Sequence, residues 1–235
     1  MNDPMFGPPD NRITPDDRAR VYEILGFGGQ ASARTAPNFL DLATLVHATR
    51  LLELHAKAQE EHQRGLGGGR LRGLTEYRVG VELMSHRAHL GITEVRKGSP
   101  NHVGREVDRT RTIIGTIHTH PWDVVQSIGD VRNLIRANDI VGGVLTYTGR
   151  MSLLIKHPNV PEQDTAPLTS EMRLQAASLK DAPDMFRRMG VLGALSAAFD
   201  LPIRSTRDPY IGAVCRRLGL IAYAGHVTTL TLQRD

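Results

Sequence analysis

Apolar and polar positions in the middle of the chain follow the two-residue period of β-strands. Residues 111–118 carry many β-branched side chains, and residues 77–83 place an apolar side chain at every second position. Further strands are expected at 89–95, 140–147 and 151–155. Ser127 and Asp130 have the spacing of a capping pair and predict a helix between the strands expected at 111–118 and 140–147. This order predicts an α+β fold with helices packed against a sheet.

Helical spacing dominates the two ends of the chain. Residues 15–25 and 38–63 have apolar positions at helical intervals, and the glycines of 65–69 end the second segment. After a proline-rich linker, helices are expected at 171–179, 185–199 and 208–218, and a hairpin at 220–223 with 227–232. The sequence therefore predicts an N-terminal helical extension with a glycine-rich loop (1–69), a core (70–157), and a C-terminal helical extension with a terminal hairpin (158–235).

Composition narrows the class of protein. Hydrophobic residues make up 40% of the 235 residues and charged residues 23%, which is typical of globular proteins. The single cysteine, Cys215, excludes an internal disulfide and is expected to be a buried structural thiol. The chain shows neither the apolar run of a secretion signal nor one long enough to span a membrane, so a cytoplasmic location without a membrane partner is expected. The net charge of +4 comes mostly from arginine, and basic patches could meet nucleic acid, but only 5% of the residues are aromatic, which argues against a nucleic-acid partner.

The strand at 111–118 leads into a pair of histidines, His118 and His120. Side chains two apart on a strand point the same way, and Pro121 should end the strand there. Ser127 and Asp130 follow, and by themselves they have a structural explanation as a helix cap. Two imidazoles and one carboxylate, with a fourth position left to water, are also the ligand set of a catalytic zinc.

The residues His118, Thr119, His120, Pro121, Ser127 and Asp130 resemble the motif of the JAMM (JAB/MPN) metalloprotease family, bacterial type. That motif runs His-x-His-Pro, a short loop, and Ser-x-x-Asp; the loop here is one residue shorter than usual. The resemblance implies a curved mixed sheet flanked by helices, a JAMM/cytidine-deaminase-like core. It also implies one Zn²⁺ per chain on His118, His120 and Asp130, and an oxyanion-stabilising role for Ser127.

The family also uses an upstream glutamate as general base. Glu76, at the start of the strand that covers 77–83, fits this role best. Glu82 shares its parity on the strand and is the second candidate, whereas Glu60 and Glu61 lie in a predicted helix. Such a base would take a proton from the zinc-bound water and pass it to the departing amine.

The resemblance implies a zinc-dependent, deubiquitinase-like (iso)peptidase that cleaves after the C-terminus of a ubiquitin-like protein, to process a precursor or to remove it from a conjugate. The expected partners are that protein or its conjugates, with homologues of activating and conjugating enzymes, in a bacterial conjugation or antiviral defence system. Two alternatives stay open: a metal-dependent phosphoesterase or DNA-repair-associated JAMM-like protein, and a JAMM-like scaffold without activity.

Overall fold

The computed structural model describes residues 13–27, 36–67, 74–84, 89–100, 110–120, 126, 128–157 and 218–234. The helices are α1 (Pro15–Ile24), α2 (Arg50–Gly67) and α3 (Ile128–Arg136), and a 3-10 turn, η1, covers Leu42–Thr44. The strands are β1 (Phe39–Asp41), β2 (Thr75–Leu83), β3 (Leu90–Ile92), β4 (Arg96–Pro100), β5 (Thr112–His120), β6 (Val141–Thr146), β7 (Arg150–Lys156), β8 (Leu220–His226) and β9 (Thr231–Arg234). The helices predicted at 171–179 and 185–199, the linker before them and Cys215 lie outside the described residues.

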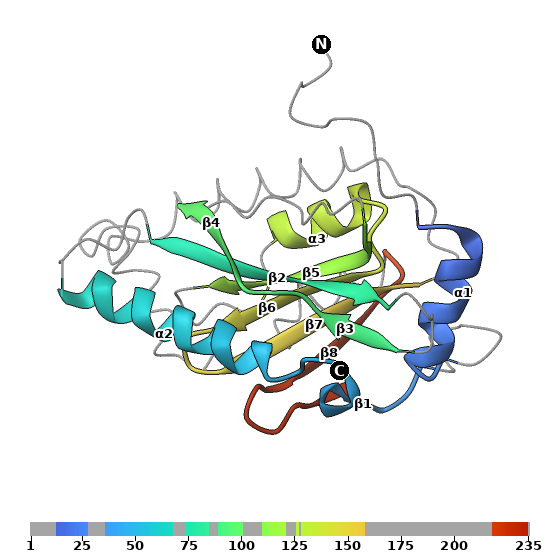
Figure 1. Cartoon of the computed structure of the whole chain (residues 1–235), viewed down its shortest axis with the longest axis horizontal. Coiled ribbons are helices and arrows are strands. Elements are labelled where there is room, and N and C mark those ends of the chain that lie inside the picture. The colour runs from blue at the N-terminus through green and yellow to red at the C-terminus, as the bar shows by residue number, and fades with distance from the viewer. Residues whose placement is uncertain are drawn as a thin grey trace, which may run out of the picture.

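All nine of these strands belong to one curled mixed sheet (Figure 1). Its order is β1-β9-β8-β7-β6-β5-β2-β3, and β4 pairs with β2 beside β3. Only β5 and β6 pair in parallel, and α3 is the crossover that this pairing requires. The prediction of an α+β fold with a mixed sheet is therefore confirmed.

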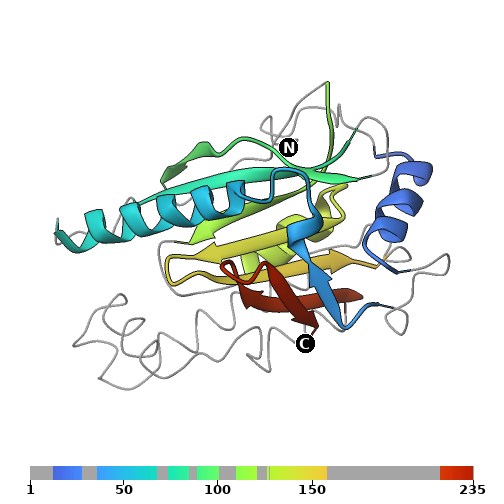
Figure 2. The ribbon, with the colours of Figure 1, turned by 60° about the horizontal axis from the view of Figure 1, so that its bottom comes forward.

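Helices cover both faces of the sheet (Figure 2). On one face, Leu51 and Leu54 of α2 belong to the main hydrophobic core, together with strand residues such as Ile117 and Leu145. On the other face, α3 packs through a smaller apolar cluster of Val131, Leu134, Ile135, Leu154, Leu218 and Leu220. A site built between β5 and α3 therefore lies on the face opposite α2.

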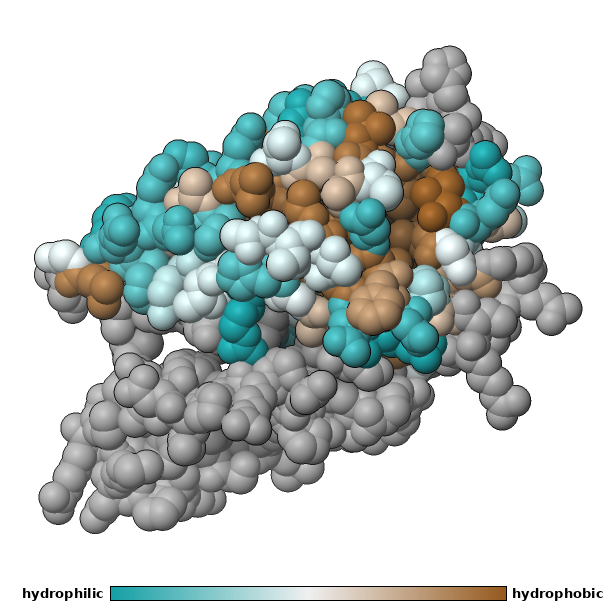
Figure 3. All heavy atoms as spheres, turned by 90° about the horizontal axis from the view of Figure 1, so that it is seen from below, coloured by the Kyte–Doolittle hydropathy of each residue, from teal (hydrophilic) through white to brown (hydrophobic). Residues whose placement is uncertain are grey.

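Helix α2 has the amphipathic pattern of a helix with one covered side. Leu51, Leu54 and Ala58 are buried, whereas Glu53 and Glu60 are exposed. The left part of the face shown in Figure 3 is accordingly hydrophilic, with apolar residues toward the centre and right.

None of the described helices combines the length and the apolar character that crossing a bilayer requires.

The helix predicted over 38–63 is wrong in its first half. Residues Phe39–Asp41 form β1, which pairs with β9, and the Asp41 side chain then accepts a hydrogen bond from the Ala43 backbone N–H at 2.9 Å. His47 adopts a positive φ of 61°, which a helix interior does not allow, and α2 begins only at Arg50. Pairing with a distant strand overrides the helical spacing of these residues.

Other predicted elements agree more closely with the structure. The helix expected at 15–25 forms as α1 and begins at Pro15 with a capping box of Thr14 and Asp17, and Gly149, with a positive φ of 86°, lies between β6 and β7. The strand expected at 89–95 is shorter, as β3, and a separate strand, β4, follows it. The predicted terminal hairpin forms as β8 and β9, and β8 pairs along its whole length with β7. The regions 1–69, 70–157 and 158–235 thus all contribute strands to one sheet.

Candidate metal centre

Close packing of α3 on β6 brings Asp130 to the two histidines. A Cβ atom on Gly142 would lie 3.3 Å from the Leu134 side chain, so the glycine lets α3 approach the sheet closely. Asp130 lies one helical turn before Leu134 and shares its side of the helix. Thr116 pairs with Gly142 in the parallel ladder, and His118, two residues later, therefore projects from the same face of the sheet.

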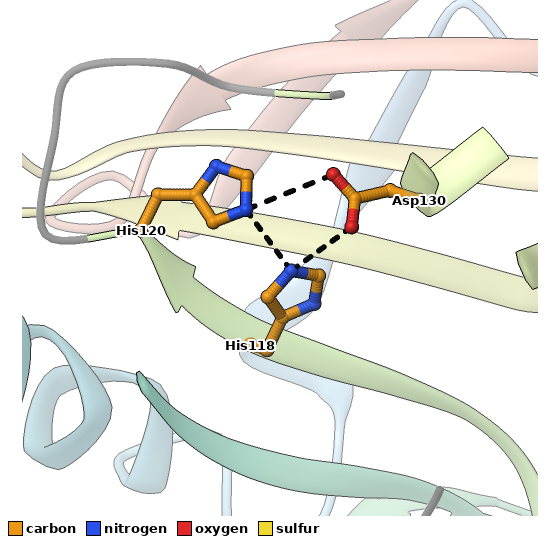
Figure 4. Close-up of side chains that lie close together, drawn as sticks. All are labelled: His118, His120 and Asp130. Atoms are coloured by element: carbon orange, nitrogen blue, oxygen red, sulfur yellow. Dashed lines mark hydrogen bonds and ion pairs between the residues drawn. The ribbon is translucent and has the colours of Figure 1, made fainter. Parts of the chain in front are cut away.

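The side chains of His118, His120 and Asp130 converge at the end of β5 (Figure 4). The two Nε2 atoms are 3.1 Å apart, and Asp130 places Oδ1 3.2 Å from Nε2 of His118 and Oδ2 3.7 Å from Nε2 of His120. The three side chains are 12–17% exposed, so a bound ion would stay accessible to a small molecule. These residues form the one group among the described residues that could hold a metal ion.

The electrostatics of the cluster favour a positive charge at its centre. Burial by itself would lower the pKa of His118, but the carboxylates of Asp130 and Glu76 outweigh burial and raise that pKa. Contacts with the Asp130 side chain and with the Gly143 backbone raise it further. The Nε2 atom of His118 faces both His120 and Asp130, so it points toward the space in which an ion would be bound.

Glu76 lies beside the metal cluster. Arg78 pairs directly with His118 across β2 and β5, and Glu76 precedes Arg78 by two residues. Burial raises the pKa of Glu76, His118 lowers it and Asp130 raises it, which places the carboxyl within electrostatic reach of both ligands. The net effect is a raised pKa, so the carboxyl takes up a proton more readily than an exposed glutamate does.

The structure separates Glu82 from the cluster. Glu82 pairs with Ile113 near the opposite end of β2, about 13 Å along the strand from the position that faces His118. Its carboxylate is buried and forms an ion pair of 3.6 Å with Arg111. It lines a cavity of about 380 Å³ that also contains His47 and Arg50. Of the two candidate bases, only Glu76 is brought to the histidines.

Ser127, with Pro121 and residues 122–125, lies outside the described residues. Gln126 next to it is buried, and its side-chain amide donates a hydrogen bond of 3.4 Å to the Ser152 carbonyl oxygen. This bond attaches the segment just before α3, the helix that carries Asp130, to β7.

Two residues that sequence reasoning left without a role contact the Glu76 segment. The Thr119 hydroxyl accepts a hydrogen bond from the Tyr77 backbone N–H at 2.9 Å, and a Glu61 carboxylate oxygen accepts one from the Thr75 backbone N–H at 3.2 Å. The position of Thr119 between the two histidines was the one signal in the sequence for the first contact. Glu61 had no comparable signal, because its helix meets β2 only in the folded chain.

Comparisons of the chain with protein-family models, with curated proteins and with solved structures found no match. The metal cluster and the carboxyl group beside it are therefore the features from which a function is inferred.

Proposed function

We propose that the chain is a zinc-dependent peptidase or isopeptidase with a JAMM-like core. The observation that supports this proposal is the convergence of His118, His120 and Asp130 with a fourth group, Glu76, whose pKa is raised beside them. Three protein ligands and a nearby general base are what a metal-dependent hydrolase needs. A structural zinc site would instead be closed by four protein ligands.

The donor set and its dimensions fit zinc. Bond lengths of about 2.0–2.2 Å in a tetrahedron place ligand atoms about 3.3–3.6 Å apart. Here the two Nε2 atoms are 3.1 Å apart, and the Asp130 oxygens are Oδ1, 3.2 Å from His118, and Oδ2, 3.7 Å from His120, which lie on both sides of that range. Two imidazoles also disfavour magnesium and calcium, which prefer oxygen ligands. His118, His120 and Asp130 would hold the ion.

The chain's own groups supply the proton transfers. Zinc, when bound, would lower the pKa of its water toward about 7 and polarise the substrate carbonyl. Glu76, half-buried and with a raised pKa, would accept the proton from the attacking water and release it to the departing amine. Ser127, which directly precedes the residues of α3 in the sequence, would donate a hydrogen bond to the developing oxyanion, a contact worth about 10²–10³ in kcat.

The resemblance of the His-x-His-Pro and Ser-x-x-Asp residues to the JAMM motif supports the substrate class. We infer that the scissile bond is an amide or isopeptide bond after the C-terminus of a ubiquitin-like protein. Conjugates of that protein, and homologues of activating and conjugating enzymes, would be the partners. Such a system would operate in the bacterial cytoplasm.

Metal analysis and a cleavage assay test the proposal. The full-length protein should bind one zinc per chain and cleave a ubiquitin-like protein, ubiquitin itself in the first instance, whose C-terminus carries an amide-linked fluorophore. Glu76→Gln should keep the zinc and lose activity by about 10²–10⁴. Glu82→Gln is the matched control and should stay active, because Glu82 is remote from the cluster.

Three results would contradict the proposal or replace it. Full activity in Glu76→Gln would exclude that residue as the base. Hydrolysis of bis(p-nitrophenyl) phosphate without amide cleavage would favour the phosphoesterase alternative, although such enzymes generally use two metals and the described residues contain one candidate cluster. Stoichiometric zinc without any hydrolysis would favour a scaffold.

A further inference from the structure

The backbone on both sides of Glu76 is held by side chains from other elements. On the N-terminal side, the Thr75 N–H donates to a carboxylate oxygen of Glu61 from α2. On the C-terminal side, the Tyr77 N–H donates to the Thr119 hydroxyl from β5. We call Glu61 and Thr119 together the Glu76 clamp. Its two contacts bracket the residue whose carboxyl lies beside the metal ligands.

Thr119 joins the Glu76 segment to the histidines. It is 1% exposed and lies between His118 and His120, so its side chain projects from the opposite face of β5. The ladder between β2 and β5 is regular from the pair Arg78 and His118 to the pair Val81 and Gly115, and the Thr119 hydroxyl extends the connection by one residue toward Glu76. The contact between Thr119 and Tyr77 therefore joins β5, which carries the two histidines, to β2, which carries Glu76, next to the candidate metal ligands.

The other edge of β2 is irregular at the same place. Between Thr75 and Tyr77 the register with β4 shifts, since Thr75 pairs with Pro100 and Tyr77 with Lys97. Such irregularities reorient a side chain and interrupt regular pairing. Regular pairing between β2 and β4 therefore does not fix the backbone at Glu76. Side-chain contacts from α2 and β5 then matter more for its position.

Glu61 is suited to replace that support. Glu61 is 6% exposed. Its carboxylate accepts hydrogen bonds from the Thr75 N–H, from Arg64 Nε at 3.0 Å and from the Tyr77 hydroxyl at 3.4 Å. A buried carboxylate bonded to several donors is held in one orientation. Glu61 thus attaches the start of β2 to α2 on the face opposite the metal cluster.

We propose that Thr119 and Glu61 are positioning residues that hold the Glu76 backbone against the strand of the two histidines. They touch neither the candidate ligands' coordinating atoms nor the reacting atoms, and they act through Glu76. This inference rests on the proposed function. A general base must lie within about 2.6–3.2 Å of the proton that it takes. A displacement of about 1 Å can cost about a hundredfold in rate.

A pair of substitutions at Thr119 tests the clamp. Thr119→Val keeps the shape and removes the acceptor, whereas Thr119→Ser keeps the acceptor. We expect Thr119→Val to keep its zinc and its KM and to lower kcat by about tenfold to a hundredfold. Thr119→Ser should recover most of that loss. In a Glu76→Gln background, Thr119→Val should have no further effect on kcat, because the residue through which it acts is already gone.

Glu61 has a matched control on its own helix. Glu61→Ala should lower kcat in the same way as Thr119→Val. Arg64→Ala removes an exposed partner of Glu61 but leaves its bonds to Thr75 and Tyr77, so its kcat should stay near that of the wild-type chain.

Amide hydrogen exchange at Tyr77, measured by NMR, tests the clamp without any activity. The Tyr77 N–H should be protected in the wild-type protein and in Thr119→Ser, and should exchange at least tenfold faster in Thr119→Val. Unchanged exchange there would overturn the clamp even if the protein proves to be no peptidase. An active wild-type protein whose Thr119→Val variant keeps full kcat would overturn the positioning role while leaving the proposed function intact. Equal losses of kcat from Thr119→Val in the presence and absence of Glu76 would show a merely structural effect.

Discussion

Zinc should stabilise the folded protein by an amount that can be worked out from the site. The two Nε2 atoms already lie 3.1 Å apart, and each has an Asp130 carboxylate oxygen at 3.2 or 3.7 Å, close to the edge length of a zinc tetrahedron, so binding needs little rearrangement. At free zinc one hundred times above Kd, binding to the folded state adds about 2.7 kcal/mol. For a chain of 235 residues, at about 2–4 °C per kcal/mol, Tm should rise by about 5–11 °C.

Thermal unfolding of metal-free protein, with and without added zinc, measures this shift. His118→Ala removes one of three ligands and should lose nearly all of it. His89→Ala is the control, because His89 is an exposed histidine outside the cluster and should leave the shift unchanged. A rise of less than about 2 °C at saturating zinc, or an equal rise in His118→Ala, would refute a zinc site built on these residues.

Two further predictions concern the scaffold. Gly115→Ala should destabilise the fold by about 1–3 kcal/mol or more, since the new Cβ would lie 2.0 Å from the Val141 carbonyl oxygen; Gly67→Ala, where nothing lies within 4 Å, is the control, and chemical denaturation that finds the two equal would contradict this reason. Burial raises the pKa of Tyr22 from 10.0 to about 12, because its hydroxyl is enclosed where it donates to the Lys156 carbonyl. The Tyr22 hydroxyl therefore ionises less readily in the folded state than in the unfolded state. The stability that the neutral hydroxyl contributes is complete below pH 10 and is lost as the pH rises toward 12. Between pH 9 and 12 the unfolding free energy of Tyr22→Phe should fall by about 1–3 kcal/mol less than that of the wild-type protein. Identical slopes in the two proteins would contradict this role of Tyr22.

The candidate ligands could be recognised from local sequence because both halves of the cluster are local patterns. His118 and His120 share a face of any strand, and Ser127 with Asp130 marks the start of a helix. The structure has that strand, β5, and that helix, α3, within a few residues of the expected bounds. Short-range rules of this kind depend only on neighbours in the chain, so they can be read before the fold is known.

The choice between Glu76 and Glu82 was not available from the same rules. The two residues share a parity on a strand, and periodicity alone treats them alike. The antiparallel register, with Arg78 opposite His118, places one near the ligands and the other at the far end. Register depends on the partner strand, which sequence neighbours do not specify.

The sequence by itself determined the types of most elements and the ligand residues of the candidate metal cluster. Only the tertiary structure decided that residues 39–41 join β9 as a strand, that β8 extends the core sheet beside β7, and that Glu61 and Thr119 hold the segment around Glu76. The physical reason is range. Caps and side-chain periodicity arise from contacts within a few residues, whereas strand partners and buried hydrogen bonds arise when distant segments are brought together by burial of a shared core.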